Sequence, residues 1–374
     1  MIVTLPSRLA AHGLRETRPI LESPVAAQEW LRLIEQVSRH RLSGFLLAAI
    51  EDESLPATEQ QVASAIGLQR ATMERVLTLD RLMLSAVERL TEAGLPHRLL
   101  KGCAHAHLLY PDPSLRPYVD VDILVPSESF ASAVAALETV GVTRVLPELR
   151  ADFDRRFGKG ATLRAPHGGA VDLHRTFVAG PFAMWIDASS LFDHFVSLTV
   201  GDMEVLALAT EERCLHACFH AAVSDLEPAL ISLRDVVQAA SAPALDLDRL
   251  LRIGGQWRAL SVIAKAVTTA WSSLEPEGEP PLARWARSFE PSAKERRVLR
   301  AYEATQHRWA HQAVAGIRAV SGVRSRIAYA TAIVAPSRRA MAWRGRSAEH
   351  RLGRVQNPLV GDPQADETGD PPTQ

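Results

Sequence analysis

Two aspartates alternate with apolar residues in the segment YVDVDILVP (118–126), and this alternation constrains the fold more than any other feature of the sequence. Such alternation with β-branched neighbours is typical of a strand with one polar face. Residues two apart on a strand point to the same side, so Asp120 and Asp122 would present their carboxylates together. Two like charges on a half-buried strand cost free energy unless a cation or a proton neutralises them. The pattern therefore predicts a cation site, with a solvated edge strand as the alternative.

A third carboxylate, Asp172, lies in the apolar segment AVDLHR on another predicted strand. Three acids on adjacent strands would suit a hard cation such as Mg²⁺, which prefers carboxylates and substrate phosphates as ligands. Two such ions would stabilise the attacking and leaving oxygens of an in-line phosphoryl displacement. A hydrogen-bonding role near a turn is the alternative for Asp172.

Further candidates flank the three acids. Lys101 and Gly102 stand where a predicted strand meets a helix, a place where backbone N–H groups can approach a phosphate. Lys101 would add a point charge there, or would extend along the surface into solvent. Arg116 would pair with a phosphate or hold the carboxylates. His174 shares the strand face of Asp172, where it would orient substrate, move a proton or form a supporting hydrogen bond.

The rest of the chain predicts an α+β fold with a small mixed sheet between helical regions. Apolar spacing favours helices over residues 25–93, with Gly94 as a C-terminal stop. A buried strand at 97–102, a helix at 103–110, a helix at 127–141 capped by Ser127, and a hairpin over 161–177 follow. From about residue 203 the pattern is helical. We expect an N-terminal helical region (1–93), a core (94–200), a C-terminal helical region (201–355) and a disordered tail (356–374).

The segment HRLLKGCAHAHLLYPDPSLRPYVDVDILV, followed later by VDLHRTF, resembles an uncharacterised bacterial nucleotidyltransferase family. That family belongs to the DNA polymerase β-like nucleotidyltransferase superfamily. The similarity covers roughly residues 95–177, with weaker support from LHACFHA (215–221) and LRDVVQA (233–239). It implies a mixed sheet with helices and metal-dependent transfer of a nucleotidyl group.

The resemblance also implies roles for individual residues. Asp120 and Asp122 would bind both Mg²⁺ ions, while Asp172 would complete the catalytic metal site and help to deprotonate the acceptor. Gly102 would cradle the triphosphate of a nucleoside triphosphate or another activated nucleotide donor. One departure stands out, because most active members of the superfamily carry Gly-Ser where this chain has Lys101-Gly102.

Other residue patterns suggest weaker alternatives. Cysteines and histidines that could suggest zinc lack the spacing of a four-ligand site; they are Cys103, His105, His107, Cys214, His216, Cys218 and His220. Residues 294–354 hold 14 basic and three acidic side chains, which predicts a solvated basic face or, alternatively, a surface for RNA, anionic lipid or an acidic partner. The net charge is −1 and the apolar runs fall short of the roughly 20 residues of a membrane span. Without a signal-peptide pattern, we expect a cytoplasmic protein.

These observations predict an enzyme that transfers a nucleotidyl or related phosphate-linked group to a small-molecule or peptide acceptor. A catalytically silent module that binds a nucleotide or a partner protein is the alternative, motivated by the missing Gly-Ser pair. An RNA-modifying enzyme that docks its substrate on the basic C-terminal helices is a third hypothesis.

Overall fold

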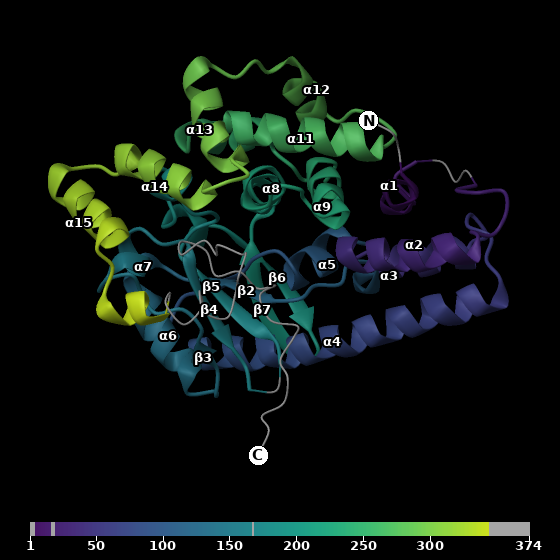
Figure 1. The fold of residues 1–374 in the computed structure, drawn as a ribbon, viewed down its shortest axis with the longest axis horizontal. Helices are drawn as coiled ribbons and strands as arrows, with labels where there is room; N and C mark the ends of the chain where they lie inside the picture. Colours follow the sequence, from purple (N-terminus) through teal and green to yellow (C-terminus); the bar gives the residue numbers. More distant parts are fainter. Residues whose placement is uncertain (1–3, 16–18, 167, 344–374) are drawn as a thin grey trace.

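A mixed seven-stranded sheet lies among helices in the computed structural model, which describes residues 4–15, 19–166 and 168–343 (Figure 1). The strand order is β3-β4-β5-β2-β1-β7-β6. The strands are β1 (Arg98–Leu99), β2 (Val121–Leu124), β3 (Thr143–Arg144), β4 (Gly160–Arg164), β5 (Ala170–His174), β6 (Phe195–Val200) and β7 (Met203–Leu208). The predicted α+β class is confirmed.

Helices precede, interrupt and follow the sheet along the chain. Those before it are α1 (Leu5–Ala10), α2 (Ala27–His40), α3 (Ser43–Glu51) and α4 (Glu59–Glu92). Those between strands are α5 (Cys103–Leu109), α6 (Phe130–Glu138), α7 (Phe153–Arg156) and the short turns η1 (Pro113–Leu115), η2 (Ser127–Ser129), η3 (Pro181–Met184) and η4 (Ser190–Phe192). Those after it are α8 (Thr210–Phe219), η5 (His220–Ser224), α9 (Leu230–Ala240), α10 (Leu247–Gln256), α11 (Leu260–Leu274), α12 (Pro281–Ser288), α13 (Ala293–Glu303), α14 (Arg308–Ala319) and α15 (Val323–Val334).

The long helix α4 has clear sequence signals at both ends. Thr58 caps its first turn, and Gln61 returns the hydrogen bond to the backbone of Thr58, which satisfies two otherwise unpaired N–H groups. At the other end Gly94 adopts a φ of +66°, a conformation that glycine tolerates best. The predicted stop at Gly94 is confirmed.

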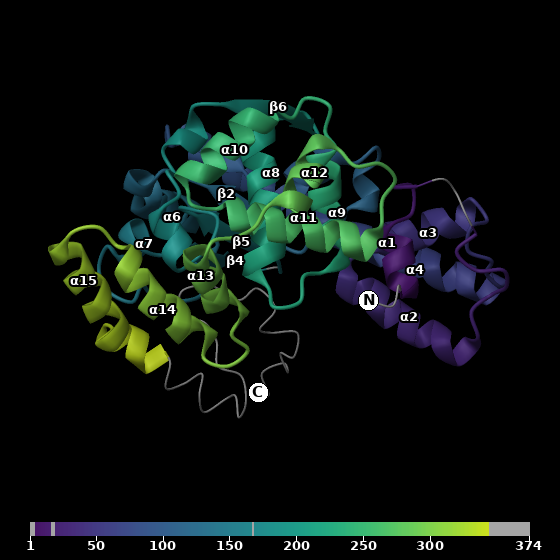
Figure 2. The same cartoon turned by 90° about the horizontal axis from the view of Figure 1, so that it is seen from above.

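The two faces of the sheet pack against different helical layers (Figures 1 and 2). Val121 and Ile123 of β2 belong to a hydrophobic cluster with side chains of α4 and α6. Leu124 belongs to a second cluster, which contains side chains of α8, α9 and α11. Because side chains alternate along a strand, the even-numbered residues of β2 face the C-terminal helices.

Two local expectations are corrected. Ser127 does not cap a helix; it lies in the turn η2, and α6 begins at Phe130. The helix expected from residue 203 is wrong for Met203–Leu208, which form β7 and pair with β6. Gly201, with a φ of +59°, permits the tight turn between these strands. This turn lets residues 203–208 pair with β6, so they extend the sheet and do not form the expected helix.

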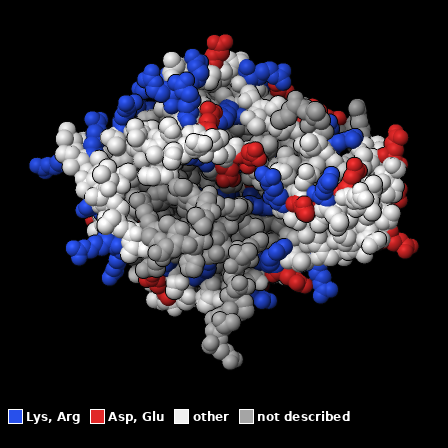
Figure 3. Space-filling model, viewed as in Figure 1, with Lys and Arg blue, Asp and Glu red and all other residues white. Residues whose placement is uncertain are grey.

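The boundaries at residues 93, 200 and 355 stay a prediction, with the last strand of the sheet ending at Leu208. The tail expected to be disordered (356–374) lies outside the described residues. Lysines and arginines gather over α13 and along the edge formed by α14 and α15, where the sequence is basic (Figure 3). Within the described ranges, no helix combines the length and apolar character needed to cross a bilayer.

Candidate functional site

The register of two parallel strands brings two of the predicted acids together. β2 pairs with β5 so that Asp122 lies opposite Asp172 and Leu124 lies opposite His174. Asp120 is the residue immediately before β2. The three acids are all buried, with exposed fractions of 4% for Asp120, 3% for Asp122 and 7% for Asp172. They therefore meet beneath the C-terminal helices and not on a solvated edge.

Asp122, Asp172 and His174 form a compact group of potential ligands. One ligand atom from each lies within 4.8 Å of the others. His174 Nε2 is 2.8 Å from Asp122 Oδ1, which is a hydrogen bond when that nitrogen carries the proton. Thr162 of β4 donates a hydrogen bond of 2.7 Å to Asp172 Oδ1. Each carboxylate is thus oriented by a neighbouring strand.

Lys101 contacts the acids from the end of β1. Its Nζ lies 2.9 Å from Asp122 Oδ2 and 3.7 Å from Asp120 Oδ2, and its side chain is 10% exposed. The next residue, Gly102, has φ +62° and ψ −116° and precedes α5. This backbone conformation is open almost solely to glycine. Gly102 therefore fixes the turn that presents Lys101 to the carboxylates.

Burial and neighbouring charges separate the pKa values of the acids. Burial, together with the nearby Asp120 and Asp122, raises the pKa of Asp172 to about 7. Burial opposes ionisation of Asp122 too, but Lys101 and His174 outweigh it and hold the pKa of Asp122 well below its usual range. Burial lowers the pKa of His174, so this ring is neutral near pH 7.

The donor set fits a hard divalent cation. Asp122 Oδ2 is buried, and the contact that meets its charge is the ammonium of Lys101 at 2.9 Å. Carboxylate oxygens of Asp120, Asp122 and Asp172 are ligands of the type that Mg²⁺ prefers. His174 would orient Asp122 for metal binding through the hydrogen bond between the two side chains.

Arg116 is engaged away from the acids. Its guanidinium donates to Asp235 of α9 through Nε at 3.2 Å and Nη2 at 2.6 Å. Tyr110 also donates to Asp235, at 2.8 Å, and His105 Nδ1 lies 3.1 Å from the same carboxylate. The sequence analysis gave Arg116 to a phosphate or to the carboxylates; the structure instead gives it a buried ion pair with Asp235.

The sequence analysis did not single out Asp235, Thr162 or Lys159. Asp235 lies in LRDVVQA, one of the segments that resembled the family, and an acid next to an arginine in a largely apolar helix was the available signal. Thr162 gave no signal, because its role depends on the pairing of β4 with β5. Lys159 lies near enough to lower the pKa of Asp172.

The suspected zinc ligands do not assemble. Cys103, Cys214 and Cys218 are buried free thiols. Among the described residues, the group found capable of holding a metal comprises Asp122, Asp172 and His174, with no cysteine. His105 and His216 are ring neighbours 6.4 Å apart, a distance typical of core packing.

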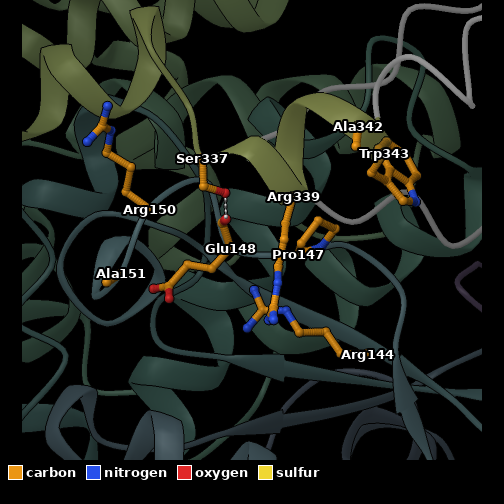
Figure 4. Close-up of a pocket in the computed structure, with 9 residues that line it drawn as sticks. All are labelled: Arg144, Pro147, Glu148, Arg150, Ala151, Ser337, Arg339, Ala342 and Trp343. Carbon is orange, nitrogen blue, oxygen red and sulfur yellow. Dashed lines mark hydrogen bonds between the residues drawn. The ribbon is translucent and has the colours of Figure 1, made fainter.

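A pocket of about 720 Å³ lies apart from the acids, between the loop after β3 and residues near the end of the described chain (Figure 4). Its lining residues are Arg144, Pro147, Glu148, Arg150, Ala151, Ser337, Arg339, Ala342 and Trp343. None of the predicted site residues lines this pocket. The acids, and not this pocket, carry the convergent carboxylates that metal-dependent chemistry needs.

Comparisons with known proteins bear on this site. A family model described as "Uncharacterised nucleotidyltransferase" matches residues 26–274, which is more than half of the chain. No curated protein matches the chain.

Three of the solved structures that match this chain have low sequence identity to it. The antibiotic-resistance factor ANT(2'')-Ia is 14% identical over 49% of this chain and 93% of that chain, with a TM-score of 0.35. The lincosamide antibiotic adenylyltransferase LnuA, solved with lincomycin, is 15% identical over 43% of this chain and 96% of its own, with a TM-score of 0.31. An antigenic nucleotidyltransferase-like protein from Paracoccidioides brasiliensis is 14% identical over 52% and 92%, with a TM-score of 0.32.

Proposed function

Because the chain belongs to this family of uncharacterised nucleotidyltransferases, we propose that it transfers a nucleotidyl or related phosphate-linked group from an activated donor to a small-molecule or peptide acceptor. The observation that carries the proposal is the register of β2 against β5, which sets Asp122 opposite Asp172. Buried carboxylates that lie close together are candidates for a catalytic or metal-binding site, whereas scattered surface acids are not.

In the proposed reaction, an oxygen of the acceptor attacks the α-phosphorus of a nucleoside triphosphate. A new P–O bond forms, the bond to the β-phosphate bridging oxygen breaks, and pyrophosphate leaves with that electron pair. Mg²⁺, when bound by Asp120, Asp122 and Asp172, would neutralise the phosphate oxygens and align the attacking and leaving groups.

Each side chain has a definite task in this proposal. Asp122 supplies a carboxylate that stays ionised, and Asp172 would complete the metal site and help to deprotonate the acceptor. His174 orients Asp122 through its 2.8 Å hydrogen bond. Gly102 fixes the turn that carries Lys101 to the carboxylates at the start of α5.

The test compares wild type with Asp122→Asn. Each of the four nucleoside triphosphates, labelled at the α-phosphorus, is incubated with Mg²⁺ and with pooled small-molecule and peptide acceptors, and pyrophosphate and labelled products are measured. We expect turnover in wild type and a loss of about a hundredfold or more in the variant, because removing one electrostatic contact to a transition state costs that much.

Asp154→Asn is the matched control. Asp154 is another buried aspartate that faces an arginine, Arg144, and it lies outside the acid group. It should keep its turnover. Undiminished label transfer by Asp122→Asn, with its circular dichroism unchanged, would refute the catalytic role of the acids.

A silent binding module is the second candidate, and a specific observation favours it. The acids are buried, Lys101 already neutralises them, and the pocket of Figure 4 lies elsewhere. Isothermal titration with Mg²⁺ and each nucleoside triphosphate separates the two functions. Binding without pyrophosphate release for every donor and acceptor would support the module and contradict the enzyme.

A further inference from the structure

The ammonium of Lys101 lies where a cation between Asp120 and Asp122 would lie. It is 2.9 Å from Asp122 Oδ2 and 3.7 Å from Asp120 Oδ2. The side chains of these two aspartates are 5% and 0% exposed. Carboxylates so thoroughly removed from water need a positive charge in contact with them, and Lys101 supplies it.

The backbone holds Lys101 in this place. Gly102 packs against the segment that leads into β2, because a Cβ added to Gly102 would be 3.5 Å from Tyr118 Cβ and 3.6 Å from the carbonyl oxygen of Asp120. The turn between β1 and α5 therefore lies directly against the acids. The lysine stem is anchored, while its four-carbon chain leaves the ammonium able to withdraw.

Lys101 and Asp122 form an ion pair in direct contact. The ammonium lies 2.9 Å from Asp122 Oδ2, an oxygen that is buried. A metal ion that used this oxygen would stand next to the ammonium. Two cations in contact repel strongly where water is excluded, so both cannot be held there together.

We propose that Lys101 is a tethered counter-ion that occupies the cation position between Asp120 and Asp122 and must withdraw before a divalent cation binds. This inference rests on the proposed function, because it concerns the same acids. It assigns Lys101 a competitive role toward the metal, and it explains how Asp120 and Asp122 remain buried without one.

The test measures cation affinity and not turnover. Mn²⁺ is titrated into wild type, Lys101→Met and Lys159→Met, and free Mn²⁺ is followed by electron paramagnetic resonance. Lys159→Met is the matched control: Lys159 also acts on Asp172 through its charge, but it forms no ion pair with the acids in the described part of the chain. Methionine keeps the length and the apolar stem of lysine in both variants.

We expect Lys101→Met to bind Mn²⁺ at least about tenfold more tightly than wild type, because a like charge in contact is gone. Lys159→Met should change the affinity by less than about threefold, since the interaction of two charges weakens with distance and, within the described residues, Lys159 is not in contact with the acids. Equal tightening in both variants would reduce Lys101 to a general electrostatic influence and overturn the proposal. Weaker binding by Lys101→Met would make the lysine a helper of the metal and overturn it too.

Thermal unfolding gives a second comparison. In the presence of a chelator, Lys101→Met should have a lower melting temperature than wild type, because its acids lack their counter-ion. Saturating Mg²⁺ should raise the melting temperature of Lys101→Met by more than that of wild type. A gain equal to that of wild type contradicts the exchange of one cation for the other.

A measurement on the unchanged protein covers the case in which Lys101→Met fails to fold. The chain has four lysines, Lys101, Lys159, Lys265 and Lys294, so ¹⁵N-lysine labelling yields a simple spectrum of ammonium groups. Saturating Mg²⁺ should move or broaden the signal of Lys101 and leave that of Lys265 unchanged. An unaltered Lys101 signal, at a Mg²⁺ concentration shown by titration to be bound, would refute displacement.

The outcomes separate the two proposals. If wild type binds a divalent cation but Lys101 is not displaced, the tethered counter-ion fails and the proposed function stands. If neither wild type nor either variant binds Mn²⁺ or Mg²⁺, both the metal-dependent function and the proposed role of Lys101 are wrong.

Discussion

Asp235 illustrates how a buried charge is held in this protein. The carboxylate is 1% exposed and receives Arg116, Tyr110 and His105 together. Burial alone would raise its pKa, but Arg116 and His105 outweigh burial and keep the pKa far below the ordinary value. Removing one partner of a buried ion pair leaves the other charge buried and uncompensated. This destabilises the fold more than replacing both partners by apolar residues would.

Asp235→Asn should therefore lower the free energy of unfolding at pH 7 by about 3–5 kcal/mol. The folded-state pKa of Asp235 lies below the unfolded value of roughly 4, so the stabilisation is complete above that pH and is lost as the pH falls further. Urea unfolding of wild type and variant between pH 7 and 3 should show their difference shrinking below about pH 4.

Asp154→Asn is a control of opposite sign. Burial raises the pKa of Asp154 above its ordinary value despite Arg144. Folding therefore takes up a proton at Asp154 at acid pH. The free energy of unfolding of wild type, relative to that of Asp154→Asn, should rise as the pH falls. If the two variants follow the same trend with pH, the assignment of the Asp235 group is wrong.

Among the elements, the junction of β1 and α5 does the most to position the site. β1 comprises Arg98–Leu99, and α5 begins at Cys103, so three residues reverse the chain beside the acids. Gly102 makes this possible with φ +62° and ψ −116°. The sequence analysis gave Gly102 a phosphate role; whether or not phosphate binds, the backbone requires glycine at this position.

Gly102→Ala should destabilise the fold by about 1–3 kcal/mol, the cost of a non-glycine residue in this backbone region. The neighbouring atoms lie at 3.5 Å or more from an added Cβ, so the penalty is conformational and not a clash. The change in urea midpoint, with the slope unchanged, measures it.

Gly94→Ala is the matched comparison. Gly94 also has positive φ, at +66°, and an added Cβ would meet nothing within 4 Å. It ends α4, far along the chain from the acids, and its replacement should leave Mn²⁺ affinity unchanged. A smaller loss of stability for Gly102→Ala than for Gly94→Ala would contradict the strained turn.

For the molecule as a whole, the sheet depends on both helical layers. Leu100, Leu124 and Phe177 belong to the same hydrophobic cluster as residues of α8, α9 and α11. β1 also pairs with β7, which follows residue 200. The segment expected to be the core therefore completes its packing with residues from outside it.

An isolated fragment of residues 94–200 should not fold cooperatively, because it exposes that apolar face and leaves β1 without β7. We expect a broad thermal transition and strong binding of the dye ANS, as in states that lack fixed packing. A fragment of residues 1–343, which keeps both layers, should melt as the full chain does. A sharp two-state transition of the shorter fragment would contradict this dependence and favour an independent core.

The sequence by itself determined the local and repetitive features. Apolar spacing of three and four residues gave the helices of residues 25–93, and alternation gave the strand with Asp122 and the hairpin with Asp172. Such patterns depend only on neighbours a few positions apart. The family resemblance rested on those same short segments, and the match over residues 26–274 confirms it. The roles assigned to the three acids stay predictions.

Only the tertiary structure decided which charges meet. Lys101 faces Asp120 and Asp122, and Arg116 faces Asp235 more than a hundred residues away along the chain. Both arginine and lysine were candidates for phosphate, and nothing in the order of residues distinguishes a cation that awaits a ligand from one already paired. The partner of a buried charge is set by how strands and helices pack, since the cost of burial is met by whatever group the fold brings into contact.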